Sequence, residues 1–243
     1  MRTSPLPGGY MGRILRVDLT RGVITDENLP EEPLLKKLIG GQALATYILL
    51  KELPLTAKPF APENLIVIMT GPLTGNGFTP GGTKVTAVYL SPLTNTTLGR
   101  GATSGYWGTY LKSAGYDGII ISGASPTPVY LFIDQGRAEL RDASPFWGLG
   151  TRAAEDRLRG AVGLRDARVL CIGPAGENLN RAAMLANDYN HFASHSGGAV
   201  FGSKKLKAIV VHGTQRPRYA DKAKLVDAGW RWRQTLQQHD VRK

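Results

Sequence analysis

The stretch from Gly71 to Gly108 constrains the fold more strongly than any other part of the sequence. It places two segments rich in glycine and proline, Gly71–Thr83 and Ser91–Gly105, around one short apolar run, Lys84–Leu90. Glycine tolerates positive φ and lets backbone N–H groups approach a ligand closely, whereas proline fixes φ and removes a donor. The pattern predicts a strand between two loops, a platform whose backbone contacts an anionic or flat ligand. The alternative on composition alone is a pair of ordinary turns between strands.

The composition indicates a globular chain without a disulfide framework. Its 243 residues suffice for one large domain or two small ones, and 42% of them are hydrophobic. No apolar run approaches the roughly 20 residues of a membrane-spanning helix, and the first residues lack the apolar segment of a secretory signal, so we expect a cytoplasmic protein. The single cysteine, Cys171, excludes an internal disulfide and any zinc site or iron–sulfur cluster held by cysteines of this chain alone.

The net charge of +11 has two interpretations. Nucleic acid attracts basic proteins through its phosphate backbone, but here the lysines and arginines are spread along the chain without a nucleic-acid motif. The densest basic patches are Lys204–Lys207 and the tail from Arg216 onward. A polyanionic cofactor, an acidic partner or a missing chain segment explains the excess charge equally well.

Hydrophobic periodicity predicts strands interleaved with helices. We expect strands at Arg13–Leu19, Val23–Asp26, Leu65–Met69, Lys84–Leu90, Gly118–Ser122, Val129–Ile133, Ala138–Arg141, Ala167–Ile172 and Lys207–Val211. We expect helices at Glu31–Leu38, Ala43–Leu53, Tyr106–Ala114, Thr151–Gly160 and from Asp221 onward. In the second helix Leu44, Tyr47, Ile48 and Leu50 are available for burial, and the fourth helix is charged and exposed. The segment Asn187–Gly202 is polar and glycine-rich, which is typical of a loop.

Two apolar strands each lead into a Gly-Pro step. These steps, Gly71-Pro72 and Gly173-Pro174, lie roughly a hundred residues apart, and a polar, glycine-rich segment follows each of them. The pattern predicts a loose internal duplication in which two comparable loops face one ligand.

Seven short motifs stand in order between about Gly12 and Gly213. They are GPLTG (Gly71–Gly75), SPLT (Ser91–Thr94), KSAGYDGI (Lys112–Ile119), RDAS (Arg141–Ser144), IGPAGEN (Ile172–Asn178), ND (Asn187-Asp188) and GSKKLKAI (Gly202–Ile209). In these seven motifs, taken together, the sequence resembles the N-terminal domain of the aldehyde:ferredoxin oxidoreductases, a family of tungsten–pterin enzymes.

The resemblance implies an α+β, strand-rich fold with two β-sheets in a pseudo-twofold arrangement and flanking helices. In that family this domain is the base on which a bis-pterin cofactor with tungsten or molybdenum lies. Mg²⁺ bridges the pterin phosphates and takes backbone carbonyls from two loops, which correspond here to the platform and to Asn187–Gly202. Phosphates favour backbone N–H groups and a basic side chain, and Mg²⁺ favours oxygen ligands.

By this resemblance the cofactor-binding residues form two groups, and the carbonyls of Ala102 and Phe192 are the metal ligands for Mg²⁺. The first group is Gly71, Thr74, Gly75, Gly82, Lys84, Arg100, Ala102, Thr103, Ser104 and Gly105. The second group is Gly173, Gly176, Asn178, Asn187, Asp188, His191 and Phe192. The resemblance assigns no catalytic residue to this chain.

Several positions depart from the family pattern. Where the family has an arginine that faces the phosphates, this chain has Lys84, which keeps the charge but loses the bidentate fork. The family asparagine whose carbonyl binds Mg²⁺ matches Ala102 across a one-residue insertion, and since the carbonyl is the ligand, alanine can serve. Two further arginines are replaced by His191 and Gln42, while Arg100 adds one cation. We therefore expect weaker phosphate anchoring than in the family.

The family's other domains supply a 4Fe-4S cluster, four cysteines to bind it and acid–base residues, none of which this sequence contains. We expect a tail at 1–11, the pterin-binding domain at 12–214, and a linker with the start of a truncated helical domain at 215–243. The chain would then be a fragment, a truncated gene product or half of a split enzyme, in a homo- or hetero-oligomer with the missing domains or a separate subunit.

The implied enzyme oxidises aldehydes to carboxylic acids with ferredoxin as electron acceptor, and we expect this chain alone to be inactive. The competing interpretation is a non-catalytic relic or interaction module that has lost the cofactor, which the missing arginines favour. Nucleic-acid binding is a third interpretation and predicts retention of DNA that falls steeply with salt.

Individual residues also have simpler explanations. His191 and His195 would form a metal pair only on a helix, which the surrounding serines and glycines disfavour. Glu177, which could pair with the carboxylate of Asp188, is interpreted instead as capping its own turn, and Cys171 as an inert core thiol. We interpret Tyr106 and Trp107 as core aromatics, and Lys204, Lys205 and Lys207 as a solvated turn.

Overall fold

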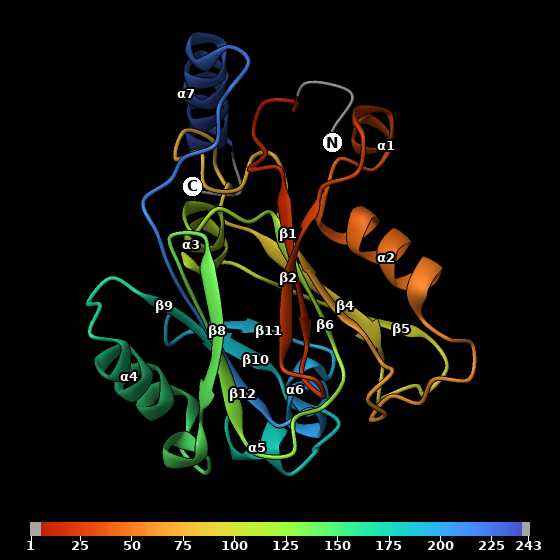
Figure 1. Cartoon of the computed structure of the whole chain (residues 1–243). Helices are drawn as coiled ribbons and strands as arrows, with labels where there is room; N and C mark the ends of the chain where they lie inside the picture. Colours follow the sequence, from red (N-terminus) through yellow and green to blue (C-terminus); the bar gives the residue numbers. More distant parts are fainter. Residues whose placement is uncertain (1–5, 240–243) are drawn as a thin grey trace.

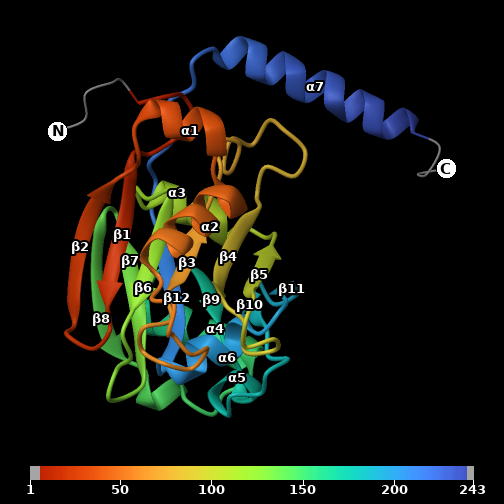
Figure 2. The same ribbon diagram turned by 90° about the vertical axis from the view of Figure 1, so that its right-hand side faces the viewer.

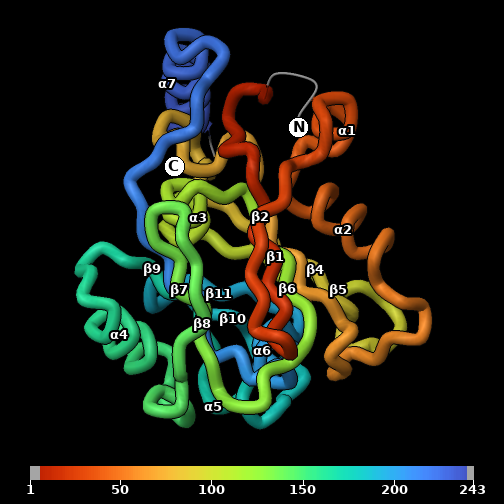
Figure 3. The backbone as a smooth tube through the Cα atoms, in the orientation of Figure 1, coloured from red at the N-terminus to blue at the C-terminus, as the bar shows by residue number. Residues whose placement is uncertain are grey.

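The computed structural model describes residues 6–239, which form two mixed six-stranded β-sheets flanked by helices (Figure 1, Figure 3). The α-helices in this part of the chain are α1 (Glu32–Leu38), α2 (Gly41–Glu52), α3 (Trp107–Ser113), α4 (Thr151–Val162), α5 (Pro174–Glu177), α6 (Gly197–Ser203) and α7 (Lys222–Gln238). A short 3-10 helix, η1, covers Ser144–Phe146. Among the described residues no helix is both long and apolar enough to cross a membrane.

The first sheet has the strand order β2-β1-β6-β3-β4-β5. Its strands are β1 (Arg13–Asp18), β2 (Val23–Asn28), β3 (Ile66–Met69), β4 (Val85–Leu90), β5 (Leu98–Thr103) and β6 (Gly118–Ser122). Only β1 and β6 run parallel, and the other neighbours are antiparallel. The central strand β3 is buried at every position, which explains its continuous apolar sequence.

The second sheet has the order β8-β7-β12-β9-β10-β11. Its strands are β7 (Val129–Asp134), β8 (Arg137–Asp142), β9 (Arg168–Cys171), β10 (Leu185–Asn187), β11 (His191–Ala193) and β12 (Leu206–His212). Here β7 and β12 are the parallel pair, and the other neighbours are antiparallel.

The two sheets repeat one topology in a pseudo-twofold arrangement. Strands β1 to β6 correspond in chain order to β7 to β12, because each sheet places its six strands in the same spatial sequence. Helices α2 and α4 each precede the third strand of their repeat, and α3 and α6 each connect the fifth strand to the sixth. The Gly-Pro steps at Gly71 and Gly173 follow the equivalent strands β3 and β9. The predicted internal duplication is therefore present in the topology.

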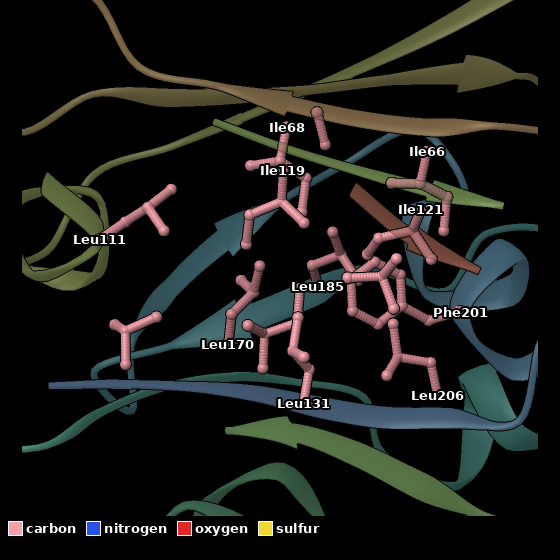
Figure 4. Close-up of a cluster of buried hydrophobic side chains, with 14 of the residues drawn as sticks. Ile66, Ile68, Leu111, Ile119, Ile121, Leu131, Leu170, Leu185, Phe201 and Leu206 are labelled. Carbon is pink, nitrogen blue, oxygen red and sulfur yellow. The ribbon is translucent and has the colours of Figure 1, made fainter. Parts of the chain in front are cut away.

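The main hydrophobic core lies between the two sheets. Figure 4 shows it: Ile66, Ile119 and Ile121 of the first sheet point toward Leu131 and Leu170 of the second. The outer faces carry separate clusters, one beneath α2 and one beneath α4 (Figure 1). A fully buried side chain of this size contributes about 1.5–3 kcal/mol relative to exposure, so this layered packing supplies most of the driving force for folding.

The structure corrects several predicted elements. Ser91–Gly105 is not a loop throughout, because Leu98–Thr103 forms β5, whose alternate glycines hid its strand pattern. The segment Asn187–Gly202 contains β11 and most of α6, and Gly173–Asn178 contains the one-turn helix α5. Short elements rich in glycine carry little periodicity, so sequence patterns do not reveal them.

Burial also differs from expectation at specific side chains. In α2, Leu44 and Ile48 are buried as predicted, but Tyr47 is 39% and Leu50 66% exposed, and Leu49 is buried instead. Helix α4 is not exposed on all sides, because Ala154, Glu155 and Leu158 face the core. Lys204 and Lys207 are not part of a solvated turn: both are fully buried, while Lys205 is exposed.

Candidate functional site

The edge strands of the two sheets, β5 and β11, lie side by side (Figure 2). Glycine allows this approach, because a Cβ at Gly101 would lie 2.8 Å from the carbonyl oxygen of Ser194 and 3.1 Å from Cβ of Ala193. Tyr89 of β4 reaches across the junction, and its hydroxyl lies 2.8 Å from the carbonyl oxygen of His195. We call residues 98–105 and 187–196 the seam.

A buried asparagine fastens the two sides of the seam together. The Asn187 side chain is fully buried and lies 2.9 Å from the hydroxyl of Thr103. With its carbonyl accepting from this hydroxyl, its amide group donates to the Ser104 carbonyl at 3.1 Å and to Asp188 at 3.2 Å. A Cβ at Gly105 would lie 2.4 Å from the Asn187 side-chain amide group, and the glycine φ is +83°, so no other residue fits there.

Asp188 holds the start of α3 against the second sheet. Its carboxylate accepts from the backbone N–H of Tyr106 and lies 3.3 Å from the Arg168 guanidinium. The same guanidinium lies over the rings of Tyr106 and Tyr110 at 5.3 and 5.0 Å. The structure therefore assigns Asp188 a partner in Arg168, and Glu177 lies elsewhere.

Glu155 supports the turn that leads into β11. Its carboxylate accepts from the backbone N–H of Tyr189 at 3.1 and 3.2 Å, and the side chain is fully buried. The pKa of Glu155 is raised to about 7, chiefly by burial: the Tyr189 N–H and Arg159 act to lower it, and the negative charge of Asp188 acts to raise it. Asp188 and Tyr189 both have positive φ, at 45° and 63°, so this turn is conformationally strained and depends on such support.

The first glycine loop, after β3, has an ordered interior. The Thr74 hydroxyl accepts from the Gly71 N–H at 3.1 Å and donates to the Lys84 carbonyl at 2.8 Å. The Gly75 N–H donates to the Gly82 carbonyl at 2.7 Å. These bonds fix the backbone from which Lys84 projects, and that side chain is exposed and has no ion-pair partner within residues 6–239.

Four further predicted residues, Arg100, Ala102, His191 and Phe192, lie on the two seam strands. Ala102 is half-buried and Phe192 is 48% exposed. Arg100 is exposed, and its guanidinium donates to the Gln42 side chain at 2.8 Å. The Nδ1 atom of His191 is buried without a hydrogen-bond partner in the described chain, so it is available to a ligand at the seam.

The second Gly-Pro loop lies far from the first. The loop after β3 is next to α7, whereas α5 lies at the opposite end of the molecule in both views (Figure 1, Figure 2). Gly173 and Gly176 line a hollow of about 300 Å³ together with Phe192 and Met184. Asn178 only bonds back to the carbonyl of Pro174, at 2.9 Å. A ligand that contacts both loops must therefore extend across the whole seam.

Three of the sequence motifs contribute side chains to two buried ion pairs. Glu177 does not cap its own turn: it pairs with Lys207 and accepts from the Gly148 N–H at 2.8 Å. Lys112 lies 3.4 Å from Asp117, and both are almost fully buried. Burial is the largest influence on this pair, lowering the pKa of the lysine and raising that of the aspartate.

The other predicted residues are now placed. His191 belongs to a strand and His195 bonds to Ser194 at 2.6 Å, so the two histidines form no helical pair. Cys171 is a buried free thiol, and burial raises its pKa to about 12. Trp107 is fully buried as expected, whereas Tyr106 is 58% exposed. In residues 6–239 no cluster of three or more histidine, cysteine or carboxylate side chains could hold a metal ion.

Sequence patterns did not reveal Glu155 and Arg168 as parts of this region. Glu155 stands in a helix rich in charged residues, TRAAEDRLRG, where a glutamate is normally exposed. The one distinctive signal is helical spacing: Glu155 lies three residues before Leu158 and Ala154 four residues before it, so all three share the buried face of the helix.

Comparisons with known proteins identify the family to which this chain is similar. The family model described as aldehyde ferredoxin oxidoreductase, N-terminal domain, matches residues 14–213. The tungsten-containing aldehyde ferredoxin oxidoreductase of Pyrococcus abyssi is 44% identical over 220 residues, covering 90% of this chain and 36% of that protein. An aliphatic sulfonate oxidoreductase, WOR-like subunit, of Pyrococcus furiosus is 40% identical, covering 89% of this chain and 36% of the relative.

A solved structure also matches over most of the chain. The active-site complex BamBC of benzoyl coenzyme A reductase, in complex with 1,5-dienoyl-CoA, superposes with a TM-score of 0.82 at 35% sequence identity. The match covers 87% of this chain and 32% of that one. The chain thus spans about a third of the length of the proteins it resembles.

Proposed function

Because this chain belongs to the aldehyde ferredoxin oxidoreductase N-terminal domain family, we propose that its seam seats the tungsten or molybdenum bis-pterin cofactor of an oxidoreductase. The observation that carries this proposal is the symmetry of the seam. Ala102 lies on β5 and Phe192 on β11, the corresponding strands of the two repeats. A cofactor built from two pterins has a matching twofold character, so each repeat would support one pterin.

The donor atoms at the seam suit Mg²⁺ and phosphate. Strands β5 and β11 are the last of their sheets, so each has an edge where backbone N–H and C=O groups lack a strand partner. Mg²⁺ prefers oxygen ligands, and we assign it to the carbonyls of Ala102 and Phe192. For the phosphates we assign the Lys84 ammonium, which has no ion-pair partner within residues 6–239, and the Nδ1 atom of His191, which has no hydrogen-bond partner there.

The chain's own residues bind and orient the cofactor. When bound, the metal–dithiolene group supplies two-electron oxidation of an aldehyde to a carboxylic acid. The 4Fe-4S cluster, the acid–base residues and the contact with ferredoxin belong to further domains or to a separate subunit, because the relatives are about three times longer. We therefore infer that this chain alone does not oxidise aldehydes and acts in the cytoplasm as part of a larger assembly.

The test measures how much cofactor the protein retains. The chain is produced together with the polypeptide that completes the enzyme, and tungsten, molybdenum and pterin fluorescence are measured per mole of purified protein. Lys84→Ala should retain several-fold less metal and several-fold less pterin, since this variant loses the positive charge that we assign to the phosphates. Lys51→Ala is the matched control, because Lys51 is an exposed lysine of α2 without an ion pair in the described structure.

Two results would contradict the proposal. Equal cofactor content in Lys84→Ala and in the unmodified protein would refute the anchoring role of this lysine. An unmodified protein that holds neither metal nor pterin would instead identify the chain as a non-catalytic interaction module.

A further inference from the structure

A second cavity lies away from the seam, between α3, the turn of the first glycine loop and the linker that leads to α7. It has a volume of about 790 Å³, which is the size of a small-molecule site. Its walls include Phe78 of the loop, Tyr110 of α3 and Tyr219 of the linker. We call it the linker cleft. The proposed cofactor function does not use it.

The linker cleft carries positive charge that no neighbouring carboxylate neutralises. Arg216, Arg218 and Lys222 line it, and none of them has a carboxylate within ion-pair distance among residues 6–239. The one carboxylate in its lining, Asp166, lies 3.3 Å from the His212 ring. The cleft therefore favours an anion, and its attraction should weaken as salt is added.

Aromatic rings stand beside these cations. Phe78 and Tyr219 pack edge to face with ring centroids 6.4 Å apart, and the Lys222 ammonium lies 5.9 Å from the Phe78 ring. Tyr219, whose pKa partial burial raises above the ordinary tyrosine value, has a hydroxyl that can donate to an anion. Aromatic rings next to cations can pack against a flat ring, while the cations attract a negatively charged group attached to that ring.

The walls of the cleft are held in place by the rest of the fold. The Gln215 N–H donates to the Ser113 carbonyl at 2.9 Å, and the Arg218 carbonyl accepts from the Gly9 N–H at 2.7 Å. On the other side Gly229 of α7 packs directly on Phe78, since a Cβ there would lie 2.4 Å from the Phe78 carbonyl oxygen. The cleft is thus formed before any ligand arrives, which lowers the entropic cost of binding.

From the cations, the rings and the size together, we propose that the linker cleft binds a mononucleotide-like anion, with its phosphate at Arg216 and Arg218 and its base against the wall formed by Phe78 and Tyr219. A simple inorganic anion would leave the aromatic wall without a partner, and a neutral ring would leave the arginines unused. Both parts of the ligand are therefore needed for full affinity.

Titration calorimetry on the whole 243-residue chain tests this, with adenosine 5′-monophosphate as the probe. Adenosine and inorganic phosphate serve as the two half-ligands. We expect saturable binding of the monophosphate, with each half-ligand at least about tenfold weaker. The double variant Arg216→Ala/Arg218→Ala should raise the Kd at least about tenfold, and Phe78→Leu should raise it while leaving phosphate binding unchanged.

Two controls distinguish a loss of binding from misfolding and from a general loss of positive charge. Lys51→Ala removes one exposed cation far from the cleft and should bind the monophosphate as the unmodified chain does. Arg216 and Arg218 are exposed, so the double variant should keep its circular dichroism spectrum. Absence of saturable binding, equal affinity for phosphate alone, or a fully folded double variant with an unchanged Kd would each overturn the proposal.

Discussion

The buried carboxyl of Glu155 makes the stability of this domain depend on pH in a way that one substitution should remove. Glu155 is fully buried in α4, and both of its oxygens accept from the Tyr189 N–H at the turn before β11. Burial raises its pKa from 4.5 to about 7 in the folded protein. Glutamine keeps the shape and one acceptor oxygen but cannot titrate.

The magnitude follows from this shift in pKa. Below pH 4.5 the carboxyl is protonated in the folded and unfolded chains alike, and its contribution to stability is complete. As the pH rises from 4.5 to about 7, the unfolded chain releases this proton first, so the free energy of unfolding decreases. The rise of the pKa from 4.5 to about 7 corresponds to at most about 3–4 kcal/mol, and this stabilisation is lost by the time the pH has passed the folded pKa.

Urea unfolding followed by tryptophan fluorescence at about pH 5 and about pH 8 measures this term. The unmodified chain should lose about 2–3 kcal/mol more between the two pH values than Glu155→Gln does. Glu139→Gln, at an exposed glutamate of β8 that pairs with Arg141, controls for the loss of a carboxyl and should follow the unmodified chain. If Glu155→Gln has the same pH dependence as the unmodified chain, Glu155 is not the group that titrates.

Two further predictions concern stability alone. Gly101→Val should lower the stability by about 1–3 kcal/mol in thermal unfolding, because its side chain would enter the space of the Ser194 carbonyl across the seam. Gly160→Ala, in open space on α4, is the control and should be neutral or slightly stabilising in the same assay. Lys207→Met should cost about 3–5 kcal/mol in urea unfolding, because it leaves the Glu177 carboxylate buried and unpaired. Adding Glu177→Leu should recover most of that loss, and a double variant no more stable than Lys207→Met would refute the pairing argument.

Long apolar elements could be predicted from the sequence because their signal is local. The segments Ile66–Met69 and 169–172 are continuous apolar runs, and each leads into a Gly-Pro step. That pair of features also predicted the internal duplication. The seam could not be predicted in this way, since β5 and β11 are short, contain polar residues or glycine, and owe their conformation to contacts with each other's sheet.

The burial of charged residues likewise could not be predicted from local sequence patterns. A sequence run such as KKLK is typical of an exposed turn, yet Lys204 and Lys207 lie inside the fold, each with specific acceptors. The Lys204 ammonium donates to the carbonyl oxygens of Pro62 and Gly123 at 3.0 and 2.7 Å. Because these acceptors come from distant parts of the chain, no local sequence pattern predicts the hydrogen bonds.

What the sequence alone determined is the class of fold, its duplication and the family resemblance. These depend on local periodicity and on short motifs, both of which are present in the linear chain. Tertiary structure decided the rest: that the two Gly-Pro loops lie at opposite ends, that Glu155 and Arg168 support the seam, and that an arginine-lined cleft forms beside the linker to α7. The physical reason is that burial and pairing are properties of residues brought together from distant positions, and only the packed chain defines them.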